Sequence, residues 1–197
     1  MTFKTDNSIK AVVICHGKSE LYIMNHIKSK LRIPIKNYAK DKGNKPIEIS
    51  SINSILNGRD FQSKSLFLQK YSNIKEERIG KKKGFAEFKL FIVLDVDHTS
   101  AEDVQRFKDR SMFKDHFLYD YIHPILNDNN LEEVLNDIGY TYAKTDKQKK
   151  EYKKLFPAGR GEQDIDRIEE FREALSKTNK SNLDELLEYC IKHCPRF

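Results

Sequence analysis

The sequence predicts an α/β protein with a mostly parallel, Rossmann-like sheet, helices on both faces of that sheet and a helical C-terminal extension. Two runs, at 11–15 and 90–94, contain only apolar residues and cysteine. Such runs are typical of strands that are buried on both faces in a parallel sheet. Segments with apolar residues at helical spacing separate the predicted strands, and this order favours right-handed strand-helix-strand crossovers.

The first part of the chain supplies a strand and a helix that the pattern defines well. The run at 11–15 is the first strand, and apolar residues at helical spacing then continue until Pro34 ends the helix. Ser19 is the expected N-cap, because its hydroxyl can accept a hydrogen bond from a free backbone N–H group. A shorter strand is predicted at 47–52, followed by one or two helices at 53–74.

The rest of the chain continues the alternation of strands and helices. Pro124 places the last predicted strand near an edge of the sheet, because proline donates no backbone hydrogen bond. The elements expected here are, in order, a turn at 81–84, a strand at 90–94, a helix at 101–118, a strand at 121–126, a short helix at 131–138 and helices at 165–175 and 183–191.

Length and composition favour one well-filled core. A chain of 197 residues with 38% hydrophobic and 34% charged residues is typical of a polar globular protein. We expect an α/β domain at 1–140 and a basic helical extension at 141–197 that packs on it. No apolar stretch approaches the about 20 residues that cross a bilayer, and no signal peptide is recognisable. Cys15, Cys190 and Cys194 lack zinc-site spacing, so we expect a cytoplasmic protein with no membrane contact.

The charge of the chain favours a polyanionic partner. The net charge is +6 and the isoelectric point is near 9.0. Basic residues gather at Lys81, Lys82 and Lys83 and again at 144–154, a cluster that interleaves with Tyr140, Tyr142 and Tyr152. Basic and aromatic side chains together suit a nucleic-acid backbone with bases free to stack. Lysine-rich solvated faces give the same pattern, so both interpretations stay open.

Two aspartates follow the second apolar run. Asp95 and Asp97 stand where the strand at 90–94 ends, since a buried strand cannot carry ionised carboxylates in its middle. Residues i and i+2 of a strand point the same way, so the two carboxylates could converge on a hard cation such as Mg²⁺. The alternative is a cap for the next helix, together with Thr99 and Ser100.

A second polar cluster, His16-Gly17-Lys18-Ser19-Glu20, closes the first strand. The carboxyl ends of parallel strands lie at one edge of a sheet, so this cluster and the two aspartates predict a composite site. Gly17 would permit a tight turn or the close approach of a phosphate to the helix N-terminus. In the alternative interpretation Gly17 is an ordinary turn residue and Glu20 complements the helix dipole.

These motifs together resemble the Toprim domain, the metal-dependent catalytic module of topoisomerases, primases, ribonuclease M5 and OLD-type nucleases. The shared features are an apolar strand that closes on an x-Gly-x-x-Glu turn and a later strand that ends in Asp-x-Asp, here Asp95 and Asp97. The segment 125–135 also resembles a stretch of RloB and AbiLii-like proteins, small Toprim proteins of restriction and abortive-infection loci. Asn127 and Glu132 match residues of that stretch, whereas Asp128 replaces its proline.

The chain departs from the Toprim pattern at one position. A typical Toprim domain has glutamate immediately before the glycine, and here that residue is His16. A histidine can shuttle protons near neutral pH or bind a metal through a neutral ring nitrogen. Glu20, one helical turn later, is the other candidate for the missing carboxylate. If neither replaces it, the resemblance implies a degenerate module that binds nucleic acid or a partner ATPase without catalysis.

Two phosphatase families share shorter motifs with the chain. His16-Gly17-Lys18-Ser19-Glu20 resembles the start of the histidine phosphatases, although Cys15 stands where that family has arginine. Asp95-Val96-Asp97-His98-Thr99 resembles the Asp-x-Asp-x-Thr motif of phosphatases of the haloacid dehalogenase type. There the first aspartate is the nucleophile and the second the general acid and base. That motif usually opens its fold, and here nearly half the chain precedes it.

The Toprim resemblance implies a metal-dependent nuclease that hydrolyses phosphodiester bonds in DNA or RNA, as the effector of a phage-defence or abortive-infection system with a possible ATPase partner. The oligomeric state stays open. The expected catalytic residues are His16, Glu20, Asp95 and Asp97. Asp95, Asp97 and Glu20 are the expected ligands of Mg²⁺ or Mn²⁺. The expected nucleic-acid contacts come from Lys18, Lys81, Lys82, Lys83 and Arg160, the last from a loop that also suits a solvated connection.

Overall fold

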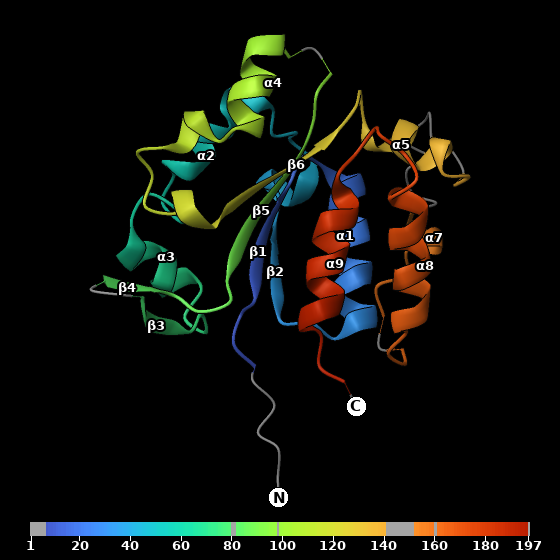
Figure 1. The fold of residues 1–197 in the computed structure, drawn as a ribbon, viewed down its shortest axis with the longest axis horizontal. Coiled ribbons are helices and arrows are strands. Elements are labelled where there is room, and N and C mark those ends of the chain that lie inside the picture. Colours follow the sequence, from blue (N-terminus) through green and yellow to red (C-terminus); the bar gives the residue numbers. More distant parts are fainter. Residues whose placement is uncertain (1–6, 80–81, 98, 141–151, 160, 197) are drawn as a thin grey trace, which may run out of the picture.

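A four-stranded parallel sheet forms the centre of the protein (Figure 1). The computed structural model describes residues 7–79, 82–97, 99–140, 152–159 and 161–196. The strands lie in the order β2-β1-β5-β6, and each neighbouring pair is parallel. Their bounds are β1 Ala11–Cys15, β2 Ile35–Tyr38, β5 Lys89–Asp95 and β6 Ile122–Asn127. The predicted α/β class with a parallel sheet is therefore confirmed.

The two apolar runs are buried because both faces of the sheet are covered. In β1, Ala11, Val13 and Cys15 enter one core, whereas Val12 and Ile14 enter the other. A central strand with helices on both faces has no position that water can reach, so every residue of β1 is buried. The same argument explains the uninterrupted apolar sequence of β5.

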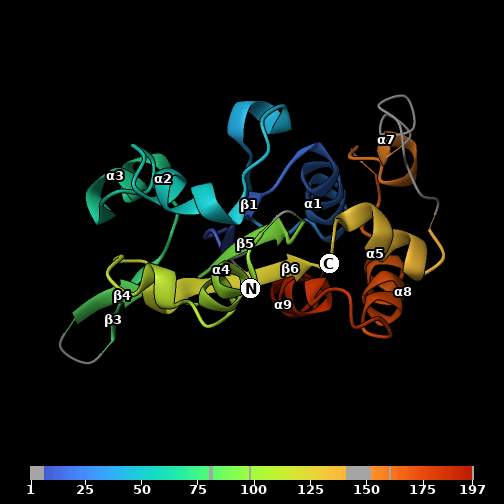
Figure 2. The ribbon, with the colours of Figure 1, turned by 90° about the horizontal axis from the view of Figure 1, so that it is seen from above.

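The helices are divided between the two faces of the sheet, as Figures 1 and 2 show. One face packs against α1 Lys18–Leu31, α5 Leu131–Asp137, α7 Tyr152–Leu155, α8 Ile165–Leu175 and α9 Leu183–His193. The other face packs against α2 Ile52–Leu56, α3 Lys64–Lys70, α4 Ala101–Lys108 and short 3₁₀ turns. None of the helices in the described part of the chain is long and apolar enough to cross a membrane.

A hairpin that the sequence did not predict projects from the body of the protein (Figures 1 and 2). It consists of β3 Glu76–Ile79 and β4 Lys82–Phe85, which pair antiparallel. The prediction of a turn at 81–84 is therefore wrong over the described residues of that segment. Charged residues fill both strands, so they lack the apolar alternation that identifies a half-buried strand.

The predicted strand at 47–52 is also wrong. Residues Ile49–Ser51 form a 3₁₀ turn and α2 begins at Ile52, whereas the second strand of the sheet is β2, Ile35–Tyr38. Strand β2 is an edge strand whose sequence, Ile-Lys-Asn-Tyr, keeps only its first side chain fully buried. Ile47, Ile49 and Ile52 point into the core from turns instead of from a strand.

Strand β6 lies at the opposite edge of the sheet, as Pro124 predicted, and a side chain covers its outer edge. The amide of Asn182, just before α9, accepts a hydrogen bond from the Leu126 backbone N–H at 2.9 Å and donates one to the Pro124 carbonyl at 3.1 Å. Asn127 then forms an isolated antiparallel bridge with Ser181. The edge of β6 therefore has partners without a fifth strand.

Candidate functional site

The candidate site lies where the chain changes direction across the sheet. From β1 the chain moves to β2 on one side, and it later returns to β5 on the other side of β1. Ligands of open α/β sheets bind at such a switch point, at the carboxyl ends of the strands. His16 directly follows β1 and Asp95 ends β5, so the topology brings these two predicted site residues together.

Asp95 is the centre of the polar cluster at this edge. Its residue is only 4% exposed, and it lies opposite Asn127 in the register of β5 and β6. The Asn127 side-chain amide donates a hydrogen bond to Asp95 Oδ1 at 2.9 Å. His16 Nε2 lies 3.8 Å from Asp95 Oδ2. Both carboxylate oxygens therefore have a polar neighbour.

The backbone around the 3₁₀ turns fixes the orientation of the His16 ring. His16 Nδ1 lies 3.0 Å from the Ile47 carbonyl oxygen, which can only accept, so Nδ1 carries a proton and Nε2 faces Asp95. The Ile47 backbone N–H donates in return to the His16 carbonyl at 3.0 Å. The histidine is thus held by the chain that follows β2.

Glu20 and Glu132 add two buried carboxylates to the cluster. Glu20 is 3% exposed, and its Oε2 accepts a hydrogen bond from the Gly17 backbone N–H at 2.8 Å. Glu132, in the first turn of α5, is 8% exposed, and its Oε1 accepts a hydrogen bond from the Ser19 hydroxyl at 2.8 Å. Glu20 therefore caps α1, and this role also brings its charge close to Asp95 and Glu132.

Burial and neighbouring negative charges raise the pKa values of two carboxyls in the cluster, Asp95 and Glu20. Burial raises the pKa of Asp95 from 3.8 to about 9, the negative charges of Glu20, Glu132 and Asp97 add to this rise, and the Asn127 hydrogen bond opposes it. Burial also raises the pKa of Glu20, with a contribution from Glu132, while His16 lowers it. None of the groups that most affect the pKa values of Asp95 and Glu20 is a lysine or an arginine.

Asp97 and Lys18 lie at the rim of the cluster. Asp97 is half-buried, its backbone N–H donates to the Asn129 carbonyl at 3.2 Å, and its charge reaches Asp95. Lys18 is exposed at the first residue of α1, next to the N-cap Gly17. The expectation that Ser19 caps this helix is wrong, because the N-cap is Gly17, two residues earlier, and the Ser19 hydroxyl binds Glu132 instead.

Of the other predicted nucleic-acid contacts, only Lys83 has a described side chain, and it is not brought to this edge. Lys83 is exposed on the β3–β4 hairpin, which lies away from the carboxyl ends of the strands (Figure 1). The side chain of Lys82 and all of Lys81 and Arg160 lie outside the described residues, and so does 144–151 of the second basic cluster.

A strained loop covers the turn between β1 and α1. Asp41 and Lys42 have left-handed backbone angles, φ 50° and 54°, and Gly43 follows at φ 85°. A Cβ atom on Gly43 would lie 2.9 Å from the Lys18 backbone nitrogen. Gly17 was expected to permit a tight turn after β1, but its backbone is extended at φ −147°. The position that requires glycine is instead Gly43, in the covering loop, because its φ is positive and the Lys18 backbone leaves no room for a side chain.

Sequence reasoning did not include Asn127 or Glu132 among the expected catalytic or metal-binding residues, and it gave Ser19, within the first polar cluster, only the role of a helix cap. Asn127 and Glu132 stand in the segment that resembles RloB proteins, and Asn127 ends β6 as Asp95 ends β5. The signal available was the position of each at a strand end or in a first helical turn. Their side-chain partners could not be derived, because Ser19 and Glu132 meet only after the whole sheet is assembled.

Carboxylate and amide oxygens are the donors that Mg²⁺ and Mn²⁺ prefer, so the cluster fits a hard cation in chemical type. Among the described residues, however, no three His, Cys, Asp or Glu side chains already stand in a metal-binding arrangement. Asp95 is held by Asn127, and Glu20 by the backbone of Gly17. Cation binding would therefore require these side chains to exchange hydrogen-bond partners for the ion.

Comparison with known proteins finds no significant match to a family model, a curated protein or a solved structure.

Proposed function

We propose that this protein is a metal-dependent phosphodiesterase that cleaves DNA or RNA, built on a Toprim-like form of the parallel α/β fold. The observation that carries the proposal is the cluster of three buried carboxylates, Glu20, Asp95 and Glu132, beside His16 at the switch point of the sheet. Buried carboxylates at such short range gain from a cation between them, since it removes the repulsion that Glu20 and Glu132 exert on Asp95.

Each residue of the cluster has a distinct task in this proposal. Asp95 and Asp97 supply oxygen ligands from the end of β5, and Glu20 supplies a third from α1. A bound Mg²⁺ polarises the phosphate and makes water a better nucleophile. His16 accepts or donates a proton at Nε2, because Nδ1 is held by Ile47. Lys18, exposed at the first residue of α1, contacts the backbone phosphates.

The test is a cleavage assay on plasmid, single-stranded DNA and total transfer RNA, run side by side with Mg²⁺, with Mn²⁺ and with EDTA. We expect cleavage of at least one substrate that EDTA abolishes and that Asp95→Asn removes. The matched control is Asp115→Asn, which makes the same chemical change at an exposed site. Equal activity of the two variants would contradict the assignment of Asp95.

A second function, binding without catalysis, is favoured by His16. This ring stands where a Toprim domain has glutamate, and its Nε2 lies 3.8 Å from Asp95 Oδ2, so a neutral nitrogen ligand replaces a carboxylate at this position. In that case the protein is a degenerate module that binds nucleic acid or a partner ATPase. Metal-independent binding together with no cleavage of any substrate would favour this function over the first.

The resemblance to phosphatases of the haloacid dehalogenase type receives less support. A nucleophilic aspartate must reach the phosphorus atom of its substrate, whereas the Asp95 side chain is only 6% exposed and is hydrogen-bonded by Asn127.

A role in phage defence with an ATPase partner rests on the Toprim resemblance alone. A cytoplasmic location is supported by three buried free thiols, Cys15, Cys190 and Cys194.

A further inference from the structure

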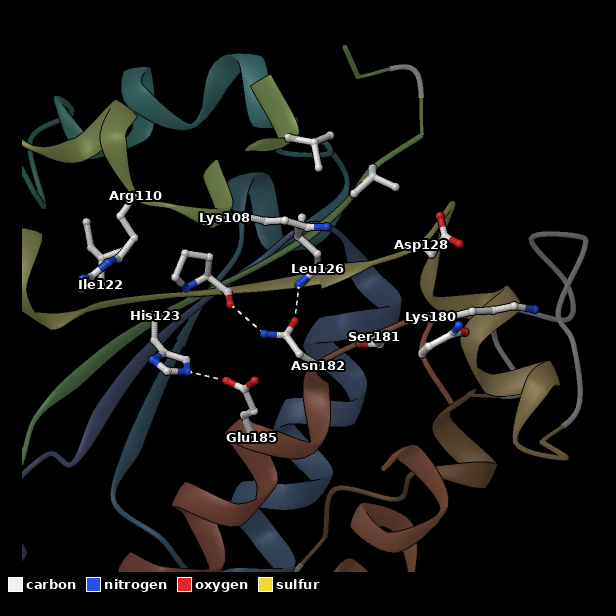
Figure 3. Close-up of a pocket in the computed structure, with 14 residues that line it drawn as sticks. Lys108, Arg110, Ile122, His123, Leu126, Asp128, Lys180, Ser181, Asn182 and Glu185 are labelled. Carbon is white, nitrogen blue, oxygen red and sulfur yellow. Dashed lines mark hydrogen bonds and ion pairs between the residues drawn. The ribbon is translucent and has the colours of Figure 1, made fainter. Parts of the chain in front are cut away.

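A cleft of about 920 Å³ runs along the outer edge of β6, between α4 and α9 (Figure 3). Lys108 and Arg110, at the end of α4, lie above the strand in this view, and His123, Asn182 and Glu185 lie below it. Val96, Val104 and Pro124, which are half-buried, give the cleft apolar walls. The cleft is separate from the carboxylate cluster, but it extends along β6 from Ile122 to Asp128 and so reaches the end of the sheet at which the cluster lies.

Two connections join the cleft to the candidate site. Val96 and Asp128 line the cleft, and they directly follow Asp95 and Asn127 in the chain. Ser181, also in its lining, donates a hydrogen bond to Asn127 Oδ1 at 2.8 Å, and the Asn127 amide donates to Asp95. A ligand in the cleft is thus two hydrogen bonds away from the central carboxylate.

The charged groups of the cleft are unequally paired. Glu185 is bound to His123 at 2.8 Å, and Lys180 is bound to Asp137 at 2.9 Å. In contrast, the structure shows no ion pair for Lys108 or Arg110 with any described residue, and the Arg110 guanidinium lies 5.0 Å from the centre of the Tyr119 ring. The α4 side of the cleft therefore offers two cations that are available to an anionic ligand.

The cleft is unsuited to two other kinds of ligand. A peptide strand cannot pair with β6 here, because Asn182 already occupies the backbone groups of Pro124 and Leu126. A volume of about 920 Å³ accommodates a ligand the size of a few nucleotides, but not a double helix. Apolar walls for bases and two cations for phosphates are instead the features of a single-strand groove.

We propose that this cleft binds a short single-stranded segment of nucleic acid and guides the adjoining phosphodiester to Asp95. The inference rests on the proposed nuclease function and names its substrate class, a single strand or an unpaired end. Lys108 and Arg110 bind consecutive phosphates, while the half-buried side chains of Val96, Val104 and Pro124 contact sugars and bases.

The test measures binding alone, by fluorescence anisotropy of short labelled single strands of DNA and RNA in EDTA, with duplexes of the same sequence as competitors. The double variant Lys108→Ala/Arg110→Ala should bind at least about tenfold more weakly, and its salt dependence should correspond to about two fewer phosphate contacts. Val104→Trp, which fills the cleft at constant charge, should weaken binding as well. Lys36→Ala, a charge change on β2 at the far edge of the sheet, is the control.

The result that overturns the inference is a double variant that binds single strands as tightly as the Lys36→Ala control, or duplexes that compete better than single strands. If the wild type cleaves nucleic acid and the binding result is the one just described, the proposed binding groove is refuted but the proposed nuclease function stands. If binding depends on Lys108 and Arg110 but no metal-dependent cleavage is found, the nuclease function is refuted and the binding groove stands. Thermal unfolding of each variant shows that losses of binding do not come from losses of fold.

Discussion

Replacing Asp95 by asparagine is expected to stabilise the metal-free protein, and increasingly so as the pH rises. Burial raises the pKa of this carboxyl from 3.8 to about 9, so the folded protein keeps a proton that the unfolded chain releases above about pH 4. Between these two pH values the unfolded state binds fewer protons, and the free energy of unfolding therefore falls as the pH rises. Asparagine is neutral at every pH and removes this loss.

The size of the effect follows from the difference between pH 7 and the ordinary pKa of aspartate. Each pH unit above that value costs the folded protein about 1.4 kcal/mol, so Asp95→Asn should gain at most about 4 kcal/mol at pH 7 and almost nothing near pH 4. The asparagine oxygen can still accept the Asn127 amide hydrogen bond, so little packing is lost. Asn127 need not change its orientation.

Urea unfolding of the wild type and Asp95→Asn in EDTA at several pH values between 4 and 9 measures this difference directly. Asp115→Asn, at an exposed position, should follow the wild type at each pH. With Mg²⁺ the order should reverse. The cation displaces the Asp95 proton and stabilises the wild type more as the pH rises, whereas Asp95→Asn gains little. A difference that does not grow with pH, or an Asp95→Asn variant that is less stable throughout, would refute the reasoning.

Three further substitutions separate catalysis from structure. His16→Gln should lower single-turnover cleavage by about two orders of magnitude or more while nucleic-acid affinity stays within about twofold, and unchanged cleavage would exclude a proton-transfer role. Asp97→Ala should abolish cleavage with a change in unfolding free energy of less than about 1 kcal/mol, since its side chain is half-buried; a large loss of stability with retained cleavage would show a structural role. Gly43→Ala should cost about 1–2 kcal/mol more in urea unfolding than Gly139→Ala, because both glycines have positive φ but only Gly43 has the Lys18 backbone beside it, and equal losses would contradict that contact.

The part of the fold that the sequence predicts best is the part where burial leaves no choice of residue. Strands β1 and β5 are covered on both faces, so 11–15 and 90–94 exclude charged side chains, and Asp95, also buried, ends β5 where its neighbours become polar. Strand β2 has only one neighbour and keeps Lys36 and Asn37 in contact with water or the helix beside it. Nothing in its composition distinguishes such a short edge strand from a loop.

The sequence predicts which residues lie at the centre of the candidate site but not which residues hold them in place. The pairing of β1 with β5 brings His16 to Asp95, and parallel topology alone predicts that the two strand ends lie at one edge. The contact of Ser19 with Glu132 depends in addition on where α5 starts and on how it packs against α1. Those positions are set by the three-dimensional packing of distant segments, for which local residue patterns carry no information.

The Asn182 side chain limits the association of two molecules of this protein through the edge of β6. An open strand edge is a template on which a second chain can build, and the amide of Asn182 closes that template at Pro124 and Leu126. The same residue immediately precedes α9, whose Leu183, Leu186 and Leu187 are buried in the core. Detachment of this one segment would uncover an apolar surface and an unpaired strand together, so aggregation is expected to begin at the C-terminal helix.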